Sequence, residues 1–213
     1  PFSVTEKTIR AVRELKPEAT ILGGDIVDDY TTKEEMEETF RLFGEFDTPV
    51  YYLYGNHDRQ GHAEYAGGKK FSQEDLEAAM TQNGVIILKD AYAELAPDLL
   101  LLGREDITEG EGRADIADLP NPAPEKYLIV ADHQPVRFLE NRAAGTDLQL
   151  SGHTHAGQLF PLGPLYDIIG YNYGDYTEGD AILNVSAGAC GWRMPIRTQA
   201  HCHYEVIRLQ PAD

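Results

Sequence analysis

Cysteine is the first of three shortages in this chain. Cys190 and Cys202 are the 2 cysteines among 213 residues. Two cysteines cannot form the multiple-disulfide framework of a small secreted domain, and their spacing matches no zinc motif. We therefore interpret them as two buried thiols in a protein of a reducing compartment, with a single disulfide as the alternative.

Positive charge is the second shortage. Lys and Arg number 18 against 36 Asp and Glu, so the formal net charge is -18. Because nucleic-acid-binding proteins draw much of their affinity from basic residues that contact phosphates, we expect no nucleic-acid partner. A phosphorylated substrate stays open, since bound divalent cations can outweigh the acidic charge around them.

Long apolar runs are the third shortage. No stretch approaches the roughly 20 apolar residues of a membrane-spanning helix, and no signal peptide is visible. The sequence begins at Pro1 rather than at Met, so a membrane anchor upstream stays open. We expect a single domain over residues 1–213, located in the cytoplasm or at a membrane.

Helix and strand patterns alternate along the chain. Capping boxes at Ser3/Glu6 and Thr32/Glu35 predict two helices, which end before Pro17 and towards Phe46. Further helices are expected over 72–80 and 135–144, and a long surface loop over 103–124. Strands are expected over 19–22, 49–54, 85–88, 99–102, 127–131, 148–150, 182–185 and 204–209.

Metal-binding types of residue follow four of these strands directly. They are Asp25, Asn56, His133 and the pair His153 and His155. Each alone is weak, because Asp after glycine is common in turns and a lone His is usually just hydrogen-bonded. In layered α/β folds, however, strand ends meet at one edge and form sites there. The coincidence predicts a metal centre, and oxygen and imidazole ligands suit Mn, Fe or Zn.

The same residues fall into recognisable blocks. Gly24-Asp25, Gly55-Asn56-His57-Asp58, His133 and Gly152-His153-Thr154-His155 resemble, in this order, the motifs of the calcineurin-like metallophosphoesterase family. Residues 151–158 resemble a bacterial, membrane-associated branch of it. The family's first block, Asp-x-His on the first strand, has no counterpart here, so we expect an N-terminally incomplete domain. A truncated piece of a complete enzyme is favoured over a natural short form.

The resemblance implies an α/β fold, a four-layer αββα sandwich of two mixed sheets flanked by helices, with the first strand missing. It implies phosphoester hydrolysis at a dinuclear metal centre with a metal-bound hydroxide as nucleophile. Phosphodiester or pyrophosphate cleavage is favoured over monoester cleavage. The alternative is a non-catalytic metal-binding or interaction module, degenerate because the first block is absent.

The resemblance also implies a role for each site residue. Two divalent ions (Mn, Fe or Zn) are expected in the complete enzyme, and one in this chain. Asp25 would bridge the ions, His57 would help to neutralise or protonate the leaving oxygen, and Asp58 would orient His57. Asn56, His133 and His153 would complete one ion site, and His155 would serve the other.

The substrate is expected to be a small phosphorylated or lipid-linked molecule, and a membrane would be reached through an upstream anchor. Residues 159–176 read as a loop, which either packs on the sheet or covers the site and binds an apolar leaving group. A second loop carries Trp192, Arg193 and Arg197, where an arginine could bind phosphate. The histidines without an assigned partner, read as surface or strand residues, are His62, His201 and His203.

Overall fold

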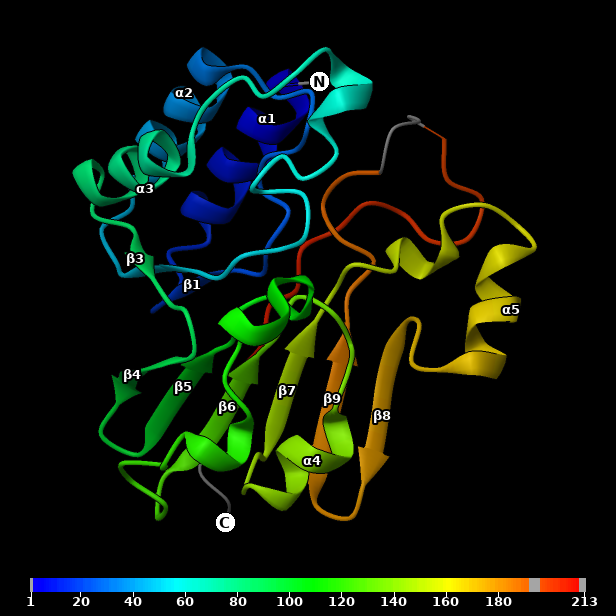
Figure 1. Ribbon diagram of the computed structural model, residues 1–213. Helices are drawn as coiled ribbons and strands as arrows, with labels where there is room; N and C mark the ends of the chain where they lie inside the picture. The colour runs from blue at the N-terminus through cyan, green and yellow to red at the C-terminus, as the bar shows by residue number, and fades with distance from the viewer. Residues whose placement is uncertain (1, 192–195, 211–213) are drawn as a thin grey trace.

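The computed structural model describes residues 2–191 and 196–210. Trp192 and Arg193 therefore lie outside the described residues. Two β-sheets pack face to face, and helices cover their outer faces (Figure 1). The expectation of an α/β fold with two helix-flanked sheets is confirmed.

The first sheet has three parallel strands in the order β1-β2-β3, where β1 is Thr20–Leu22, β2 is Val50–Tyr52 and β3 is Ile86–Ile87. Three helices cover its outer face: α1 (Phe2–Glu14), α2 (Lys33–Phe43) and α3 (Gln73–Gln82). The capping box of Thr32 and Glu35 forms as predicted, and Ser72 and Asp75 form another at α3. Because both ladders are parallel, the expectation of two mixed sheets is wrong for this one.

The second sheet is mixed, in the order β4-β5-β6-β7-β9-β8. Its four central strands run parallel: β5 (Leu99–Gly103), β6 (Tyr127–Ala131), β7 (Leu148–Ser151) and β9 (Ala181–Val185). The edge strands β4 (Ala91–Ala96) and β8 (Gly174–Glu178) pair antiparallel. Helix α4 (Phe138–Ala143) lies on the outer face, where Phe138 packs against Leu183 and Val185.

Apolar side chains fill the space between the sheets and between sheet and helices. Tyr51 and Leu53 pack against Leu101 and Ile129 in the layer between the two sheets. Side chains of this size, buried to this extent, supply most of the driving force for folding. They also fix the two sheets relative to each other, and therefore fix the strand ends from which the candidate ligands come.

Several local expectations are wrong. Helix α4 begins at Phe138 rather than at Pro135. Residues 204–209 form no strand, because they pair with neither described sheet, and their alternating pattern alone supplies no partner. Both cysteines are exposed free thiols rather than buried ones.

Two segments read as loops contain regular structure. Residues 103–124 hold the short 3-10 helices Ile107–Gly112 and Ile116–Asp118, and the loop is partly buried, with Arg104, Glu105 and Asp106 inside the protein. Residues 159–176 contain the helix α5 (Leu162–Ile169) and the start of β8. None of the helices in the described residues is long and apolar enough to cross a membrane.

Candidate metal centre

Three predicted ligands meet at the carboxyl ends of strands from both sheets. Asp25 follows β1, His133 follows β6 and His153 follows β7, and one ligand atom from each lies within 4.8 Å of the others. His133 Nε2 lies 3.1 Å from Asp25 Oδ2 and 3.3 Å from His153 Nδ1. Three atoms of the kinds that bind metals therefore converge on one point, as they would around a cation.

Glycine makes this convergence possible. A Cβ on Gly24 would lie 2.6 Å from His133 Nδ1, and a Cβ on Gly55 would lie 2.3 Å from Asp25 Oδ1. Both distances are shorter than any side chain tolerates, so each position requires the absence of one. The two loops that carry Asp25 and Asn56 approach each other only because both motifs contain glycine.

Strained backbone accompanies the site. Asp25 (φ 52°), His153 (φ 68°) and His155 (φ 51°) all adopt the left-handed conformation, which residues other than glycine rarely adopt. Such strain is commonly found at functional sites, where the surrounding structure holds it in place.

The tautomer of His133 follows from its hydrogen bonds. Its Nδ1–H donates to the carbonyl of Gly23 at 2.8 Å, which leaves Nε2 to face Asp25 and His153. A ring fixed in this way is typical of a metal ligand. Burial by itself would lower the pKa of His133, but the hydrogen bond and charge of Asp25 raise it to about 9.

The pKa values of the two other ligands move downward. Burial would raise the pKa of Asp25, but the hydrogen bond and charge of His133 lower it. Desolvation and the charge of His133 lower the pKa of His153 to about 4, so His153 is neutral at pH 7. Ionised Asp25 and neutral His153 are the forms that bind a cation.

Asn56 supplies the clearest sign that an ion fits here. Its side-chain oxygen Oδ1 is buried and has no hydrogen-bond partner. Its neighbours Gly55 and His57 both contact Asp25, the latter through a backbone N–H that donates to Asp25 Oδ1 at 2.8 Å. A buried carbonyl oxygen without a partner costs about 1–3 kcal/mol, and coordination to a cation would remove that cost.

Asp58 does not have the role expected from the sequence. Its carboxylate is fully buried and accepts hydrogen bonds from the backbone N–H groups of Asp25, Ile26, Val27 and Gly55 at 2.7–3.1 Å. It thus joins the loop after β1 to the loop after β2. The expectation that Asp58 orients the ring of His57 is wrong, because both of its oxygens serve the backbone.

Asp29 holds the ring of His57 instead. Asp29 Oδ2 lies 2.8 Å from His57 Nδ1, and Oδ1 accepts the backbone N–H of His62 at 2.9 Å. The His62 ring lies beside that of His57, with 5.6 Å between centroids. Asp29 is 5% exposed, so the pair is shielded from water. Sequence reasoning missed Asp29; its position four residues after Asp25 was the available signal.

His155 lies outside the three-residue cluster. Its Nδ1 accepts a hydrogen bond from Arg197 Nη2 at 2.8 Å, and burial and the Arg197 charge lower its pKa. Arg197 Nη2 also donates to the carbonyl of Cys190, while its Nε and Nη1 are buried without a partner. These two unused N–H donors lie beside a candidate ligand and can bind an anionic group.

The loop after β5 is fastened to the site on two sides. Arg113 makes a bidentate ion pair with Asp132, the residue before His133, at 2.9 and 2.5 Å. Arg59, which follows Asp58, pairs with Glu105 at 2.8 Å and lies over the ring of Tyr54 at 3.7 Å. These contacts fix the loop after β5 beside the carboxyl ends of the strands.

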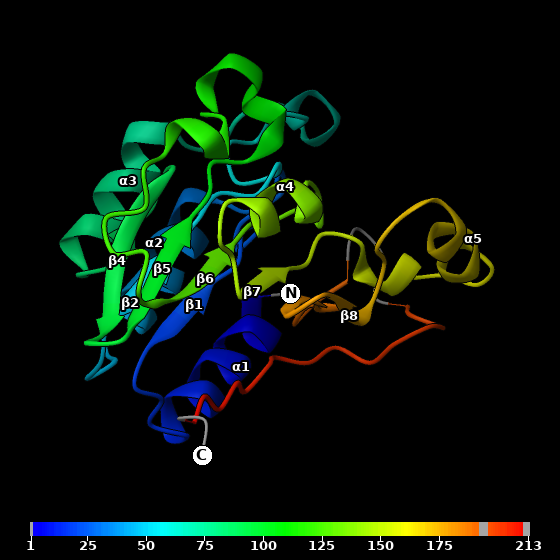
Figure 2. The same ribbon diagram turned by 90° about the horizontal axis from the view of Figure 1, so that it is seen from below.

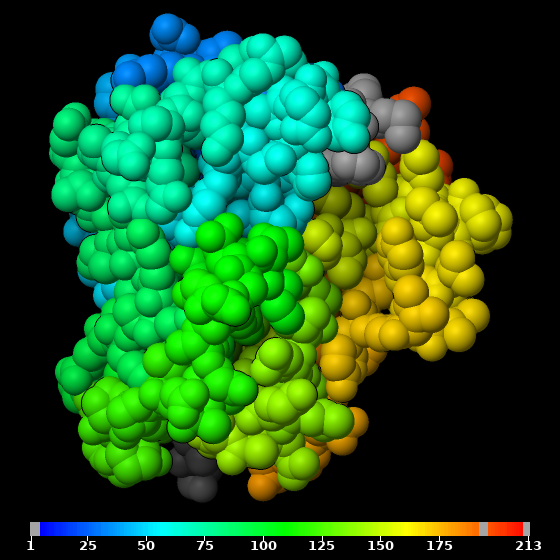
Figure 3. Space-filling model, viewed as in Figure 1, coloured from blue at the N-terminus to red at the C-terminus, as the bar shows by residue number. Residues whose placement is uncertain are grey.

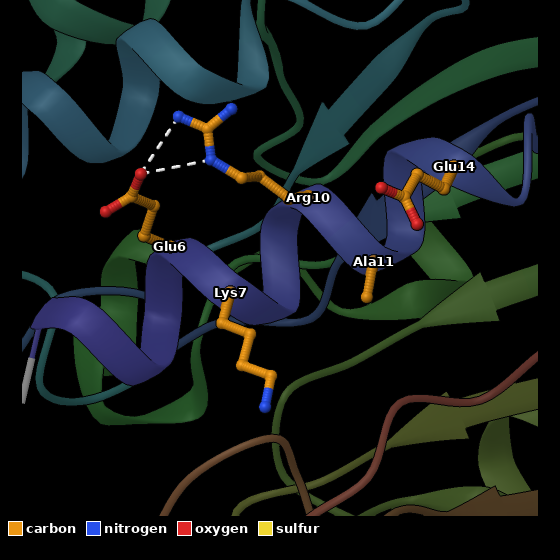
Figure 4. A pocket seen from close by; sticks show the side chains of 5 residues that line it. All are labelled: Glu6, Lys7, Arg10, Ala11 and Glu14. Atoms are coloured by element: carbon orange, nitrogen blue, oxygen red, sulfur yellow. Dashed lines mark hydrogen bonds and ion pairs between the residues drawn. The ribbon is translucent and has the colours of Figure 1, made fainter.

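A hollow elsewhere is unrelated to this site. It measures about 420 Å³ and is lined by residues of α1, namely Glu6, Lys7, Arg10, Ala11 and Glu14 (Figure 4). Arg10 and Glu6 form an ion pair across one helical turn at 2.9 Å. Such a charged, solvated helix face shares no residue with the candidate metal centre.

A sheet sandwich with carboxylate and imidazole groups gathered at its strand ends can hold a metal ion. The chain belongs to the calcineurin-like phosphoesterase family, whose model matches residues 1–157. It is 28% identical to the uncharacterized metallophosphoesterase YkuE of Bacillus subtilis, over 95% of this chain and 71% of the relative. It is 29% identical to the phosphodiesterase YaeI of Escherichia coli, over 75% of this chain and 56% of the relative.

The chain spans about half the length of several further curated relatives. Among solved structures, the protein TT1561 of Thermus thermophilus superposes with a TM-score of 0.53 at 13% identity, covering 88% of this chain and 85% of that one. This likeness supports the fold.

Proposed function

We propose that this chain hydrolyses a phosphoester with metal ions held by Asp25, Asn56, His133 and His153. The observation that carries the proposal is the convergence of Asp25, His133 and His153 within 4.8 Å. The buried amide oxygen of Asn56, which has no partner among the described residues, belongs to the loop whose His57 N–H binds Asp25. When bound, a divalent ion such as Mn, Fe or Zn supplies Lewis acidity that activates water and stabilises charge on phosphoryl oxygens.

The protein's own groups complete the reaction. Water adds to phosphorus and releases a proton to the solvent, the bond from phosphorus to the leaving oxygen breaks, and that oxygen must gain a proton. His57, held by Asp29 at 2.8 Å, is the proton donor in this proposal. Arg197, with two buried N–H donors unused, binds a phosphoryl oxygen.

In this proposal His155 and the carboxylate of Asp25 would hold a second ion. Because Asp25, His133 and His153 converge on one point and His155 lies apart from them, we expect this chain by itself to hold nearer one ion than two. Phosphodiesters are the preferred substrates in this proposal, which is supported by the likeness to the phosphodiesterase YaeI of Escherichia coli.

The test uses purified protein loaded with Mn²⁺ and assayed on bis(p-nitrophenyl) phosphate, with metal content measured by elemental analysis. His153→Ala should lose both bound metal and turnover. The matched control His201→Ala changes an exposed histidine and should retain both. Metal binding without turnover in the wild type would favour the non-catalytic module, and no metal binding would overturn the proposal.

A further inference from the structure

The helix α5 presents an apolar surface to solvent. The exposed fractions are 79% for Ile168, 75% for Ile169 and 72% for Phe160, and Leu165 is also exposed. We call these four residues the α5 face. Apolar side chains exposed together, rather than singly, mark interaction surfaces in soluble proteins.

The four residues of the α5 face are all uncharged. Asp167 is the single charged residue between positions 159 and 174. Asp167 is exposed, and its Oδ1 accepts a hydrogen bond from Asn172 Nδ2 at 3.1 Å. The aromatic residues Tyr166 and Tyr173 are also partly exposed. Aromatic rings with one polar end suit the boundary between water and lipid.

The shape of this region matches a surface more than a pocket. Helix α5 projects from the side of the molecule away from α1–α3 in both ribbon views (Figures 1 and 2). In the space-filling view its yellow atoms form a protrusion at the right-hand edge (Figure 3). Within α5, Gly163 is the buried residue. A convex helix with its apolar side chains outward can enter a lipid surface, whereas it cannot enclose a small ligand.

The protrusion is attached directly to the candidate metal centre. A Cβ on Gly157 would lie 2.3 Å from the backbone nitrogen of Gly163, so the backbone of the loop that follows His155 lies against the backbone of α5. Thr154, between His153 and His155, donates its hydroxyl proton to the carbonyl of Asn172 just after α5. A surface that holds α5 would therefore lie beside the metal ligands.

The net charge of the chain discriminates between three possible partners of the α5 face: anionic lipid, neutral lipid and a second copy of the chain. With a net charge of -18, the chain is repelled by anionic lipid and by a second copy of itself. A neutral lipid surface does not repel the negatively charged chain, and it suits the uncharged α5 face.

We propose that the α5 face inserts into the surface of a neutral lipid bilayer, and that the phosphoester cleaved at the metal centre is presented there by a membrane lipid. The substrate part rests on the proposed function, whereas the insertion does not. The metal centre then receives its substrate at the height of the lipid headgroups.

The test is co-sedimentation of the purified chain with phosphatidylcholine vesicles. Wild-type protein should bind, and Ile168→Gln and Ile169→Gln should each weaken binding roughly tenfold, since each removes one buried aliphatic side chain. Because both residues are exposed, neither change should disturb folding. Leu139→Gln, at a 55% exposed leucine of α4, is the matched control and should bind like wild type. Replacing a third of the lipid with phosphatidylserine should weaken binding.

A wild type that does not bind overturns the inference, as does a Leu139→Gln variant that loses as much as the α5 variants. Dimerisation lost in the α5 variants, without vesicle binding by the wild type, would assign the face to a second copy and overturn it too. Turnover of soluble bis(p-nitrophenyl) phosphate is measured in parallel. Turnover without vesicle binding refutes the lipid surface alone, and vesicle binding without turnover refutes the proposed function alone.

Discussion

Asp58 offers the sharpest test of how the site is built, because its carboxylate carries four hydrogen bonds. Oδ1 accepts the N–H groups of Ile26 (2.9 Å) and Val27 (3.1 Å), and Oδ2 accepts those of Asp25 (2.8 Å) and Gly55 (2.7 Å). Burial and the charge of Asp25 raise the pKa of Asp58, but four donors can be satisfied together only by two acceptor oxygens. The carboxylate is therefore required by geometry.

Asp58→Asn keeps the shape and replaces one oxygen with an NH₂ group, so two backbone donors lose their acceptor. Each buried donor without a partner costs about 1–3 kcal/mol, which predicts a loss of roughly 2–6 kcal/mol in the free energy of unfolding. Asp58→Ala leaves four such donors, and roughly 4–12 kcal/mol is comparable with the whole stability of about 5–15 kcal/mol. Metal affinity should fall as well, because the loops of Asp25 and Asn56 are no longer joined.

Urea unfolding at pH 7.5, followed by circular dichroism, measures the change. Asp180→Asn, at an exposed carboxylate, is the matched control and should unfold within about 0.5 kcal/mol of wild type. An Asp58→Asn protein that is destabilised by less than about 1 kcal/mol and still binds metal like wild type would refute the proposal that Asp58 holds the loops of Asp25 and Asn56 together.

Two further predictions concern the chemistry of the site. Asp29→Asn should lower turnover of an alkyl phosphodiester roughly tenfold or more, and turnover of an aryl phosphodiester by less, because it releases the ring of His57. The metal content should not change, since Asp29 is not a proposed ligand. An equal loss of turnover on both substrates would contradict the role of His57 as proton donor. In the metal-free protein the pKa of His133 is about 9, so His133 is protonated at pH 7.5 and must lose that proton when an ion binds. The apparent affinity for Mn²⁺ should therefore rise about tenfold per pH unit towards pH 9. Calorimetry in two buffers of different ionisation enthalpy should detect the release of one proton on binding. Binding without proton release would contradict this prediction.

The convergence of Asp25, His133 and His153 could be predicted from sequence because the signals are local. Asp25, His133 and His153 each follow an apolar strand directly, and the order of strands in a layered fold brings such ends together. The same locality explains the correct prediction of α2 and α3, whose capping boxes lie within four residues of chain.

What depends on tertiary contact was missed. Asp29 and Asp58 are neighbours of ligands in sequence, and only the packing of two loops decides which carboxylate faces His57. Strand β4 has a weak pattern, and its pairing with the apolar β5 makes it a strand. Conversely, residues 204–209 have a strand pattern without a partner. Helix α5, Leu162–Ile169, contains a glycine and a proline that argue for a loop.

The left-handed backbone of Asp25, His153 and His155 has a consequence for the evolution and engineering of this protein. Each non-glycine residue in that conformation costs about 1–2 kcal/mol, so glycine would be the more stable choice at all three positions. A laboratory selection for heat resistance alone would therefore enrich glycine at these candidate ligands, and the more stable protein would have lost the side chains proposed to bind metal. Selection schemes for this protein must consequently screen metal retention alongside thermal tolerance.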